Sequence, residues 1–166
     1  MRWIAILGLF FVLAGCGGQS KDPTAGLQDQ IDSLRQKLNN TYAPGLGEFM
    51  SGIQVHHAKL WFAGKSGNWQ LAGFEIGEIK ETIDDISKFC TDRPEISSLP
   101  MINPALDSVS AAIAHGDAAA FNRGFVVLTQ TCNNCHRATK HAFNVIKIPD
   151  TAPFTNQSFD KPHDPK

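Results

Sequence analysis

WQLAGFEIGEIKETIDDISKFC, residues 69–90, carries an apolar residue at every third or fourth position. These positions are Trp69, Ala72, Ile76, Ile79, Ile83, Ile86 and Cys90. Steps of three and four match the turn of an α-helix, so the stretch predicts one helix with one buried face, capped by Asn68. Its last position, Cys90, is expected to be a core thiol rather than a reactive one. Five acidic residues lie off the apolar line and are expected to face solvent: Glu75, Glu78, Glu81, Asp84 and Asp85.

The same spacing predicts three further helices, over about residues 44–64, 103–115 and 117–143. Pro44 suits a first turn, and Asn103 and Asp117 can cap the starts of the other two helices. Two prolines within residues 91–100 indicate a loop. Because the breaks are short and no segment alternates like a strand, we predict an all-α fold, an antiparallel four-helix bundle over residues 43–148.

The chain begins with MRWIAILGLFFVLAGC, in which the basic Arg2 precedes an apolar run over residues 3–14. The run is too short for a comfortable membrane span and is typical of a secretory signal peptide. It closes with LAGC, which resembles the lipobox of bacterial lipoproteins. The resemblance implies removal of residues 1–15, lipid attachment to Cys16 and a protein anchored to a membrane in the periplasm. Gly17 stands where an aspartate would imply the inner membrane, so the outer membrane is favoured.

Residues 16–42 are predicted to form a tether and a short amphipathic helix. The tether is polar and rich in glycine. The apolar positions that follow it fall at steps of four, three and four: Leu27, Ile31, Leu34 and Leu38. Such a stripe either packs on the following domain or forms a small coiled coil, which would make the protein a homodimer. At the other end of the chain, residues 149–166 are polar and rich in proline without periodicity, which predicts a disordered tail.

The charge of the chain limits its partners. The 166 residues carry a formal net charge of −1 and no dense run of lysine or arginine. Binding of a phosphate backbone needs a basic face, so we exclude a nucleic-acid partner. The acidic side of residues 69–90 could steer a basic partner protein.

The stretch TCNNCHRATKH, residues 131–141, holds Cys132, Cys135 and His136 at the spacing Cys-x-x-Cys-His. This spacing is the attachment signature of a c-type haem, in which two thiols form thioether bonds to the haem and the histidine binds its iron. We therefore expect one covalent haem c per chain, with His136 as the proximal ligand. Both cysteines fall on the apolar stripe of their helix, where a large hydrophobic cofactor would be received.

Two other uses of the cysteine pair stay open. A redox-active disulfide would want the strand-then-helix context of a thioredoxin, and the sequence shows no strand pattern. A zinc site would need two further ligands, which His141 and either His56 or His57 could supply.

With this motif on the last of four predicted helices, residues 43–148 resemble the four-helix-bundle c-type cytochromes of the cytochrome c-prime class. In that class a basic residue commonly follows the haem histidine by four positions, and Lys140 stands there, which implies a part in cofactor binding. The resemblance implies an electron carrier that serves redox partner proteins. With an open sixth position on the iron, it implies instead a protein that binds small gases such as NO or CO. A peroxidase-like enzyme ranks third, because only His56 or His57 could supply its polar distal group.

The sixth coordination position decides between these functions. In an antiparallel bundle the start of the first helix lies beside the end of the last, so a residue six or seven positions into the first helix is expected level with His136. Counted from Pro44, this residue is Met50, whose thioether would raise the reduction potential and favour electron transfer. His57 lies about 10 Å further along the helix and is the weaker candidate. Core packing would also explain Met50.

Overall fold

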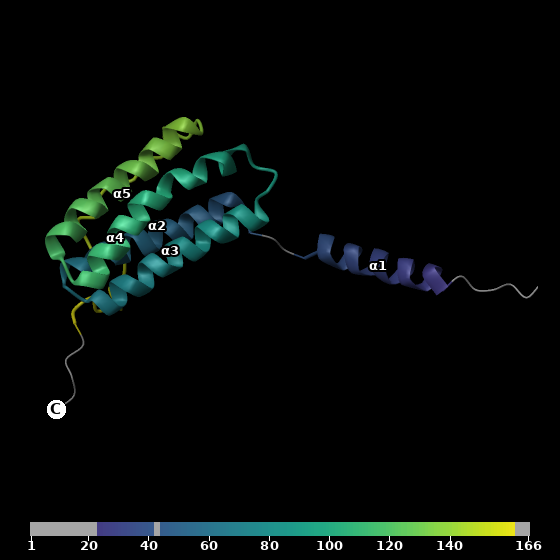
Figure 1. Ribbon diagram of the computed structural model, residues 1–166, viewed down its shortest axis with the longest axis horizontal. Coiled ribbons are helices and arrows are strands. Elements are labelled where there is room, and N and C mark those ends of the chain that lie inside the picture. Colours follow the sequence, from purple (N-terminus) through teal and green to yellow (C-terminus); the bar gives the residue numbers. More distant parts are fainter. Residues whose placement is uncertain (1–22, 42–43, 162–166) are drawn as a thin grey trace, which may run out of the picture. The chain divides into compact units, whose positions relative to one another are not determined.

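The computed structural model describes residues 23–41 and 44–161, and over these ranges the chain is helix and loop (Figure 1). The predicted all-α class is confirmed. The elements are α1 (Pro23–Asn39), α2 (Leu46–Lys65), α3 (Trp69–Phe89), the 3₁₀ helix η1 (Pro94–Ile102), α4 (Asn103–His115) and α5 (Ala118–Ala138). Among these described helices, none combines the length and the apolar character that a membrane span needs.

The chain divides into two compact units, Met1–Tyr42 and Ala43–Lys166. Within the described part of the first unit, α1 forms where a short amphipathic helix is predicted, and the apolar side chains of its stripe are exposed: Leu27, Ile31, Leu34 and Leu38. Pairing of this stripe with a second copy stays a prediction. The predicted signal peptide and Cys16 lie outside the described residues.

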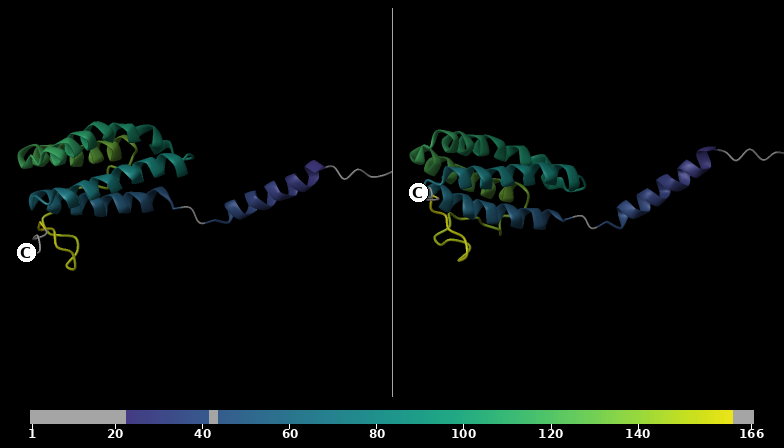
Figure 2. Two further views of the ribbon diagram at one scale, coloured as in Figure 1. Left: turned by 60° about the horizontal axis from the view of Figure 1, so that its bottom comes forward. Right: turned by 90° about the horizontal axis from the view of Figure 1, so that it is seen from below.

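In the second unit, α2 packs on α3 and α4 packs on α5, each pair antiparallel and joined by a short turn (Figure 2). Further contacts join α3 to α4 and α2 to α5, and η1 packs on α3, α4 and α5. The buried face predicted for residues 69–90 is confirmed from Ala72 to Cys90. The largest fully buried apolar side chains come from α2, α3, α4 and α5: Leu60, Ile79, Ile86, Leu106, Val109, Phe121, Phe125 and Leu128.

Two of the three predicted helix caps are confirmed. Asn68 and Asp117 each accept a hydrogen bond from the backbone amide three residues further on, at 3.1 and 2.9 Å. The cap predicted at Asn103 is wrong, because η1 runs directly into α4: Asn103 already has helical φ and ψ of −56° and −46°, and Ile102 stands at the N-cap without a side-chain hydrogen bond. The loop predicted over residues 91–100 is therefore largely 3₁₀ helix.

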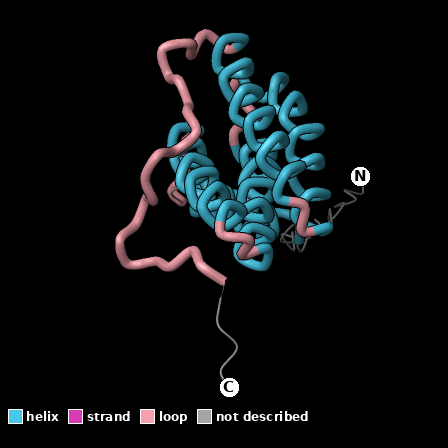
Figure 3. The backbone as a smooth tube through the Cα atoms, turned by 90° about the vertical axis from the view of Figure 1, so that its left-hand side faces the viewer, coloured by secondary structure: helices cyan, strands magenta, loops and turns pink. Residues whose placement is uncertain are grey.

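α5 ends at Ala138, whereas the periodicity predicts a helix to about Phe143. Lys140 adopts a left-handed φ of 65°, which turns the chain out of the helix. Phe143 is 83% exposed, so its ring makes no buried contact that would stabilise a further turn of helix. The chain then runs back along the helices as a loop (Figure 3).

Glu75 is completely buried, although its place off the apolar line predicts a solvated side chain. The physical reason is that α2 covers this side of α3 and supplies partners for the carboxylate. His56 Nδ1 donates to Glu75 Oε2 at 2.7 Å, and Lys59 Nζ lies 3.9 Å from Glu75 Oε1. A buried charge persists where such partners compensate it.

The segment over residues 150–161 forms no helix, in the region where the sequence predicts a disordered tail. It nevertheless has two attachment points on the helices. Phe159 is 8% exposed, and its ring centroid lies 5.7 Å from that of Phe62. The Asn68 side chain also donates to the carbonyl oxygen of Asp160 at 2.9 Å. A single aromatic residue without periodic neighbours carries no pattern that would predict such a contact.

Gly64 lies where α2 crosses α5, and a Cβ atom at this position would overlap the ring of Phe121. We expect Gly64→Ala to lower the free energy of unfolding by about 1 to 3 kcal/mol, because overpacking outweighs the better helix propensity of alanine. The matched control is Gly77→Ala on α3, where a Cβ meets no atom within 4 Å. This control is expected to raise the free energy of unfolding by up to about 1 kcal/mol. Urea unfolding gives the free energy of unfolding of both variants. Equal values for the two variants would show that the ring of Phe121 does not pack tightly against Gly64.

Candidate functional site

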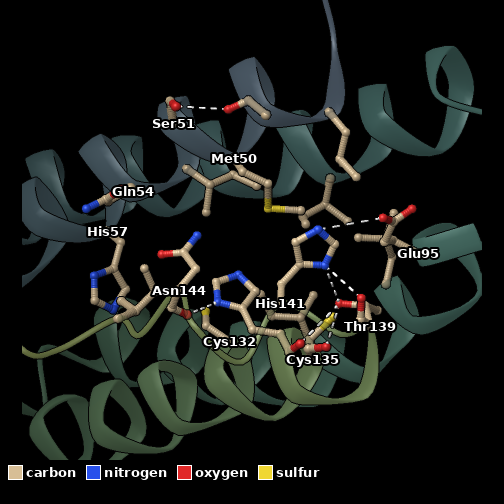
Figure 4. Close-up of a pocket in the computed structure, with 18 of the residues that line it drawn as sticks. Met50, Ser51, Gln54, His57, Glu95, Cys132, Cys135, Thr139, His141 and Asn144 are labelled. Atoms are coloured by element: carbon tan, nitrogen blue, oxygen red, sulfur yellow. Dashed lines mark hydrogen bonds and ion pairs between the residues drawn. The ribbon is translucent and has the colours of Figure 1, made fainter. Parts of the chain in front are cut away.

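A cavity of about 300 Å³ lies between the start of α2, η1 and the end of α5 with its following loop (Figure 4). Much of its wall is aliphatic: Leu46, Ile53, Ile83, Leu99, Ile102 and Ile146. It is also lined by five predicted site residues: Met50, His57, Cys132, Cys135 and His136. Lys140 does not line the cavity and is exposed on the loop. Side chains from distant parts of the sequence therefore meet in one largely apolar space.

The level of Met50 relative to His136 follows from one hydrogen bond between α2 and α5. His57 on α2 and Thr129 on α5 lie side by side, with Nε2 and Oγ1 2.9 Å apart. Seven residues before His57 is Met50, and seven residues after Thr129 is His136. Because the helices are antiparallel, both steps run about 10 Å in the same direction and end at the same level. α2 begins at Leu46 and α5 ends at Ala138, not at the predicted Pro44 and Phe143. The level of Met50 beside His136 therefore follows from the contact between His57 and Thr129, and not from counting residues from the helix ends.

The two cysteines of the motif are free thiols in the cavity wall. Burial raises the pKa of Cys132 to about 11, with a smaller contribution from Cys135, and burial also raises the pKa of Cys135. Both are therefore protonated at pH 7. A reactive thiol pair of the thioredoxin kind would need a lowered pKa, so these surroundings do not favour the disulfide alternative.

The zinc alternative lacks ligands. In the ranges 23–41 and 44–161, no group of three or more His, Cys, Asp or Glu side chains could hold a metal ion. A structural zinc site needs four such ligands. His141, named as a third ligand in that alternative, lies with its Nε2 3.9 Å from Glu95 Oε1.

His136 is oriented by the loop that follows α5. Its Nδ1 lies 2.7 Å from the carbonyl oxygen of Asn144. A carbonyl oxygen can only accept, so Nδ1 carries the hydrogen and the neutral ring leaves its lone pair on Nε2. Histidine ligands of metals are commonly held in this way, with the non-ligating nitrogen donating to a backbone carbonyl. His136 thus has the tautomer that an iron ligand at Nε2 requires.

The loop itself is held by Asn133, a residue that the sequence analysis passes over. Its Nδ2 donates to the carbonyl oxygen of Ile146, and its Oδ1 accepts from the Ile146 amide, both at 2.8 Å. No sequence signal identifies this role, because the partner is a backbone group 13 residues away on a loop.

His57 is a buried, neutral histidine. Thr129 Oγ1 donates its single hydrogen to the carbonyl oxygen of Phe125 at 2.9 Å, so it must accept the hydrogen on His57 Nε2. Burial lowers the pKa of His57 to about 4, which keeps the ring uncharged at pH 7. With Nε2 engaged and the ring packed on Phe125, His57 is better explained as a core histidine than as an iron ligand.

A charged cluster that the sequence analysis also passes over lies in the wall formed by η1 and the loop. Arg93 Nη2 donates to Glu95 Oε1 at 3.2 Å, and both residues line the cavity with His141. A backbone hydrogen bond, and then the guanidinium of Arg93, lower the pKa of Glu95, so the carboxylate is charged at pH 7. This part of the wall is polar, in contrast to the aliphatic remainder.

The cavity therefore combines two protonated thiols, an imidazole with a free Nε2 and the thioether of Met50, which reaches into it (Figure 4). Comparisons of the chain with models of known protein families, with curated proteins and with solved structures found no match. The function of the site is therefore inferred from the side chains that line the cavity.

Proposed function

We propose that this chain is a mono-haem c-type cytochrome that carries single electrons between partner proteins. The proposal rests on one observation: Cys132, Cys135 and His136 line one largely apolar cavity, with the imidazole oriented by Asn144. On this proposal the four long helices form an antiparallel four-helix bundle of the cytochrome c-prime-like class. Two antiparallel pairs of helices with contacts between the pairs support that assignment.

The residues present fit a covalently attached haem. Cys132 and Cys135 would hold it through thioether bonds, and His136 Nε2 would bind its iron. The aliphatic wall would cover a hydrophobic ring and exclude water from it. The bound group would supply an iron centre that changes by one electron. Lys140 is exposed beside the motif, and its proposed part in cofactor binding rests on the resemblance alone.

Met50 is the proposed sixth ligand. Its level beside His136 and the direction of its thioether support this role (Figure 4). A methionine ligand favours the reduced iron and raises the reduction potential, which suits an electron carrier. If Met50 only packs in the wall, the same apolar cavity would admit a small gas, and NO or CO binding becomes the function.

The proposed place of this activity is the periplasm. Lipid chains on Cys16 would anchor the protein to a membrane, with the outer membrane favoured, and residues 17–42 would separate the anchor from the cytochrome domain. The mass of the N-terminal peptide of the mature protein tests this: a peptide that begins at an unmodified residue other than Cys16 would refute the anchor.

The visible absorption spectrum of the purified full chain, ferric and ferrous, tests the function. We expect a low-spin spectrum with the charge-transfer band of a methionine–iron bond, unchanged by carbon monoxide. Met50→Ala is expected to abolish that band and to allow carbon monoxide to bind, because alanine offers no ligand atom. The matched control is Met101→Ala, since Met101 is a half-exposed methionine that does not line the cavity. A high-spin wild-type spectrum that shifts with carbon monoxide would refute Met50 as ligand and make gas binding the function.

A further inference from the structure

We propose that Asn133 is a positioning residue for His136: its side-chain amide clamps the loop whose carbonyl group orients the imidazole. The inference rests on the proposed function, because it concerns the ligand strength of His136 toward the haem iron. It adds a role for the second position of the Cys-x-x-Cys-His motif, where the haem chemistry itself requires no particular side chain.

The first step is the clamp. The side-chain amide of Asn133 pairs with the backbone N–H and C=O of Ile146, as one residue pairs with the residue opposite it in an antiparallel sheet, through two hydrogen bonds of 2.8 Å. A side-chain amide can donate and accept at once in this planar arrangement without carrying a charge. The clamp also places the side chain of Ile146 in the cavity wall.

The second step is the path from the clamp to the iron ligand. Asn144 lies two residues before Ile146, and its carbonyl oxygen accepts from His136 Nδ1 at 2.7 Å. Asn133 and His136 lie three residues apart on one face of α5, so the two contacts hold the same stretch of loop against the same helix face. The two contacts, from Asn133 to Ile146 and from His136 to Asn144, therefore join the same loop to the same helix.

Few side chains hold this loop by burial. Phe143 and Val145 point to solvent, since they are 83% and 71% exposed, whereas Ile146 and Ile148 are partly buried. Two backbone hydrogen bonds support its first half, from the His141 amide to His136 and from the Asn144 amide to His141. The half beyond Asn144 is held by the Asn133 clamp, by the half-buried side chain of Ile146 and by Ile148, which packs against the core.

The consequence for function follows from the hydrogen bond to Nδ1. Donation from Nδ1 to a carbonyl group makes the other ring nitrogen a stronger base and fixes the plane of the ring. Without the clamp, the Asn144 carbonyl group would move, and His136 would become a weaker and less ordered ligand. Loss of such an outer-shell partner typically weakens metal binding about 10-fold or more.

The test compares Asn133→Ala with Asn134→Ala in the full haem-bearing chain. Asn134 is the matched control, because it has the same side chain in the same motif but is exposed and accepts a hydrogen bond from Arg137. The first measurement is hydrogen exchange at the Ile146 amide. Asn133→Ala is expected to speed this exchange about 10-fold, because the loss of one hydrogen bond worth about 1.4 kcal/mol changes an opening equilibrium by that factor. Asn134→Ala is expected to leave it unchanged.

The second measurement is the iron–histidine stretching frequency of the five-coordinate ferrous haem, prepared by photolysis of bound carbon monoxide in the Met50→Ala background, in which carbon monoxide is expected to bind. Asn133→Ala is expected to lower this frequency relative to the Met50→Ala background alone and to the same background with Asn134→Ala. Faster exchange with an unchanged frequency would overturn the positioning role, and unchanged exchange would overturn the clamp. If Asn133→Ala does not fold, Asn133→Ser, which also lacks the amide, replaces it in both measurements. A wild-type chain without covalent haem would refute the proposed function instead, while the exchange measurement would still test the clamp.

Discussion

The double variant Cys132→Ala, Cys135→Ala is expected to retain no haem after denaturation. Only the thioether bonds of these two side chains would survive loss of the fold, because the bond from His136 to the iron breaks when the chain unfolds. The measurement is the absorption of haem that stays with the polypeptide after denaturation and acid extraction, compared with the wild type. Each single variant should keep its haem through one remaining bond, which would separate the two attachment points.

The control for this experiment is Cys90→Ala. Cys90 is a buried thiol at the end of α3, 4% exposed and outside the cavity lining. Its replacement removes a thiol without touching the motif, so the covalent haem should remain. Haem that persists on the double variant would refute the attachment, and loss of haem from Cys90→Ala alone would mean that folding, and not attachment, was measured.

The second large effect is expected from His56→Ala, which should lower the free energy of unfolding by about 3 kcal/mol. Removing His56 takes the hydrogen-bond donor away from a buried carboxyl group, and the side chain of Glu75 is only 1% exposed. Lys59 remains 3.9 Å from the other carboxylate oxygen, but that oxygen makes no hydrogen bond in the structure. Urea unfolding of the full chain, followed by helical circular dichroism, gives the difference.

Two further variants make this prediction specific. Adding Glu75→Gln to His56→Ala is expected to recover most of the lost stability, because the buried charge is gone. Glu78→Gln is the matched control: Glu78 lies 4.0 Å from His56 Nε2 but is 37% exposed, and exposed pairs contribute about 1 kcal/mol or less. Equal losses in His56→Ala and Glu78→Gln would contradict the buried pair.

Much of the helical structure could be predicted because its causes are local. The apolar steps from Ala72 to Cys90 place those side chains on one face whatever the helix packs against. The caps at Asn68 and Asp117 act on amides three residues away. An error arose where a distant segment intervenes, as at Glu75, which α2 buries and pairs with His56.

The candidate site divides in the same way. The motif of Cys132, Cys135 and His136 is visible in the sequence because its chemistry requires three residues within five positions. The clamp from Asn133 to Ile146 has no such signal, since its partner is a backbone group that any residue could supply.

By itself, the sequence determined that the chain is helical, which face of α3 is buried, and that two thiols and an imidazole share the last turns of one helix. Only the tertiary structure decided that Met50 and His136 lie at one level, that Glu75 is buried against His56, and that the Asn144 carbonyl group selects the tautomer of His136. The physical reason is the distance along the sequence between the residues in contact. Spacing along one helix is set by backbone geometry within a few residues, whereas these contacts join segments whose relative position depends on how whole helices pack.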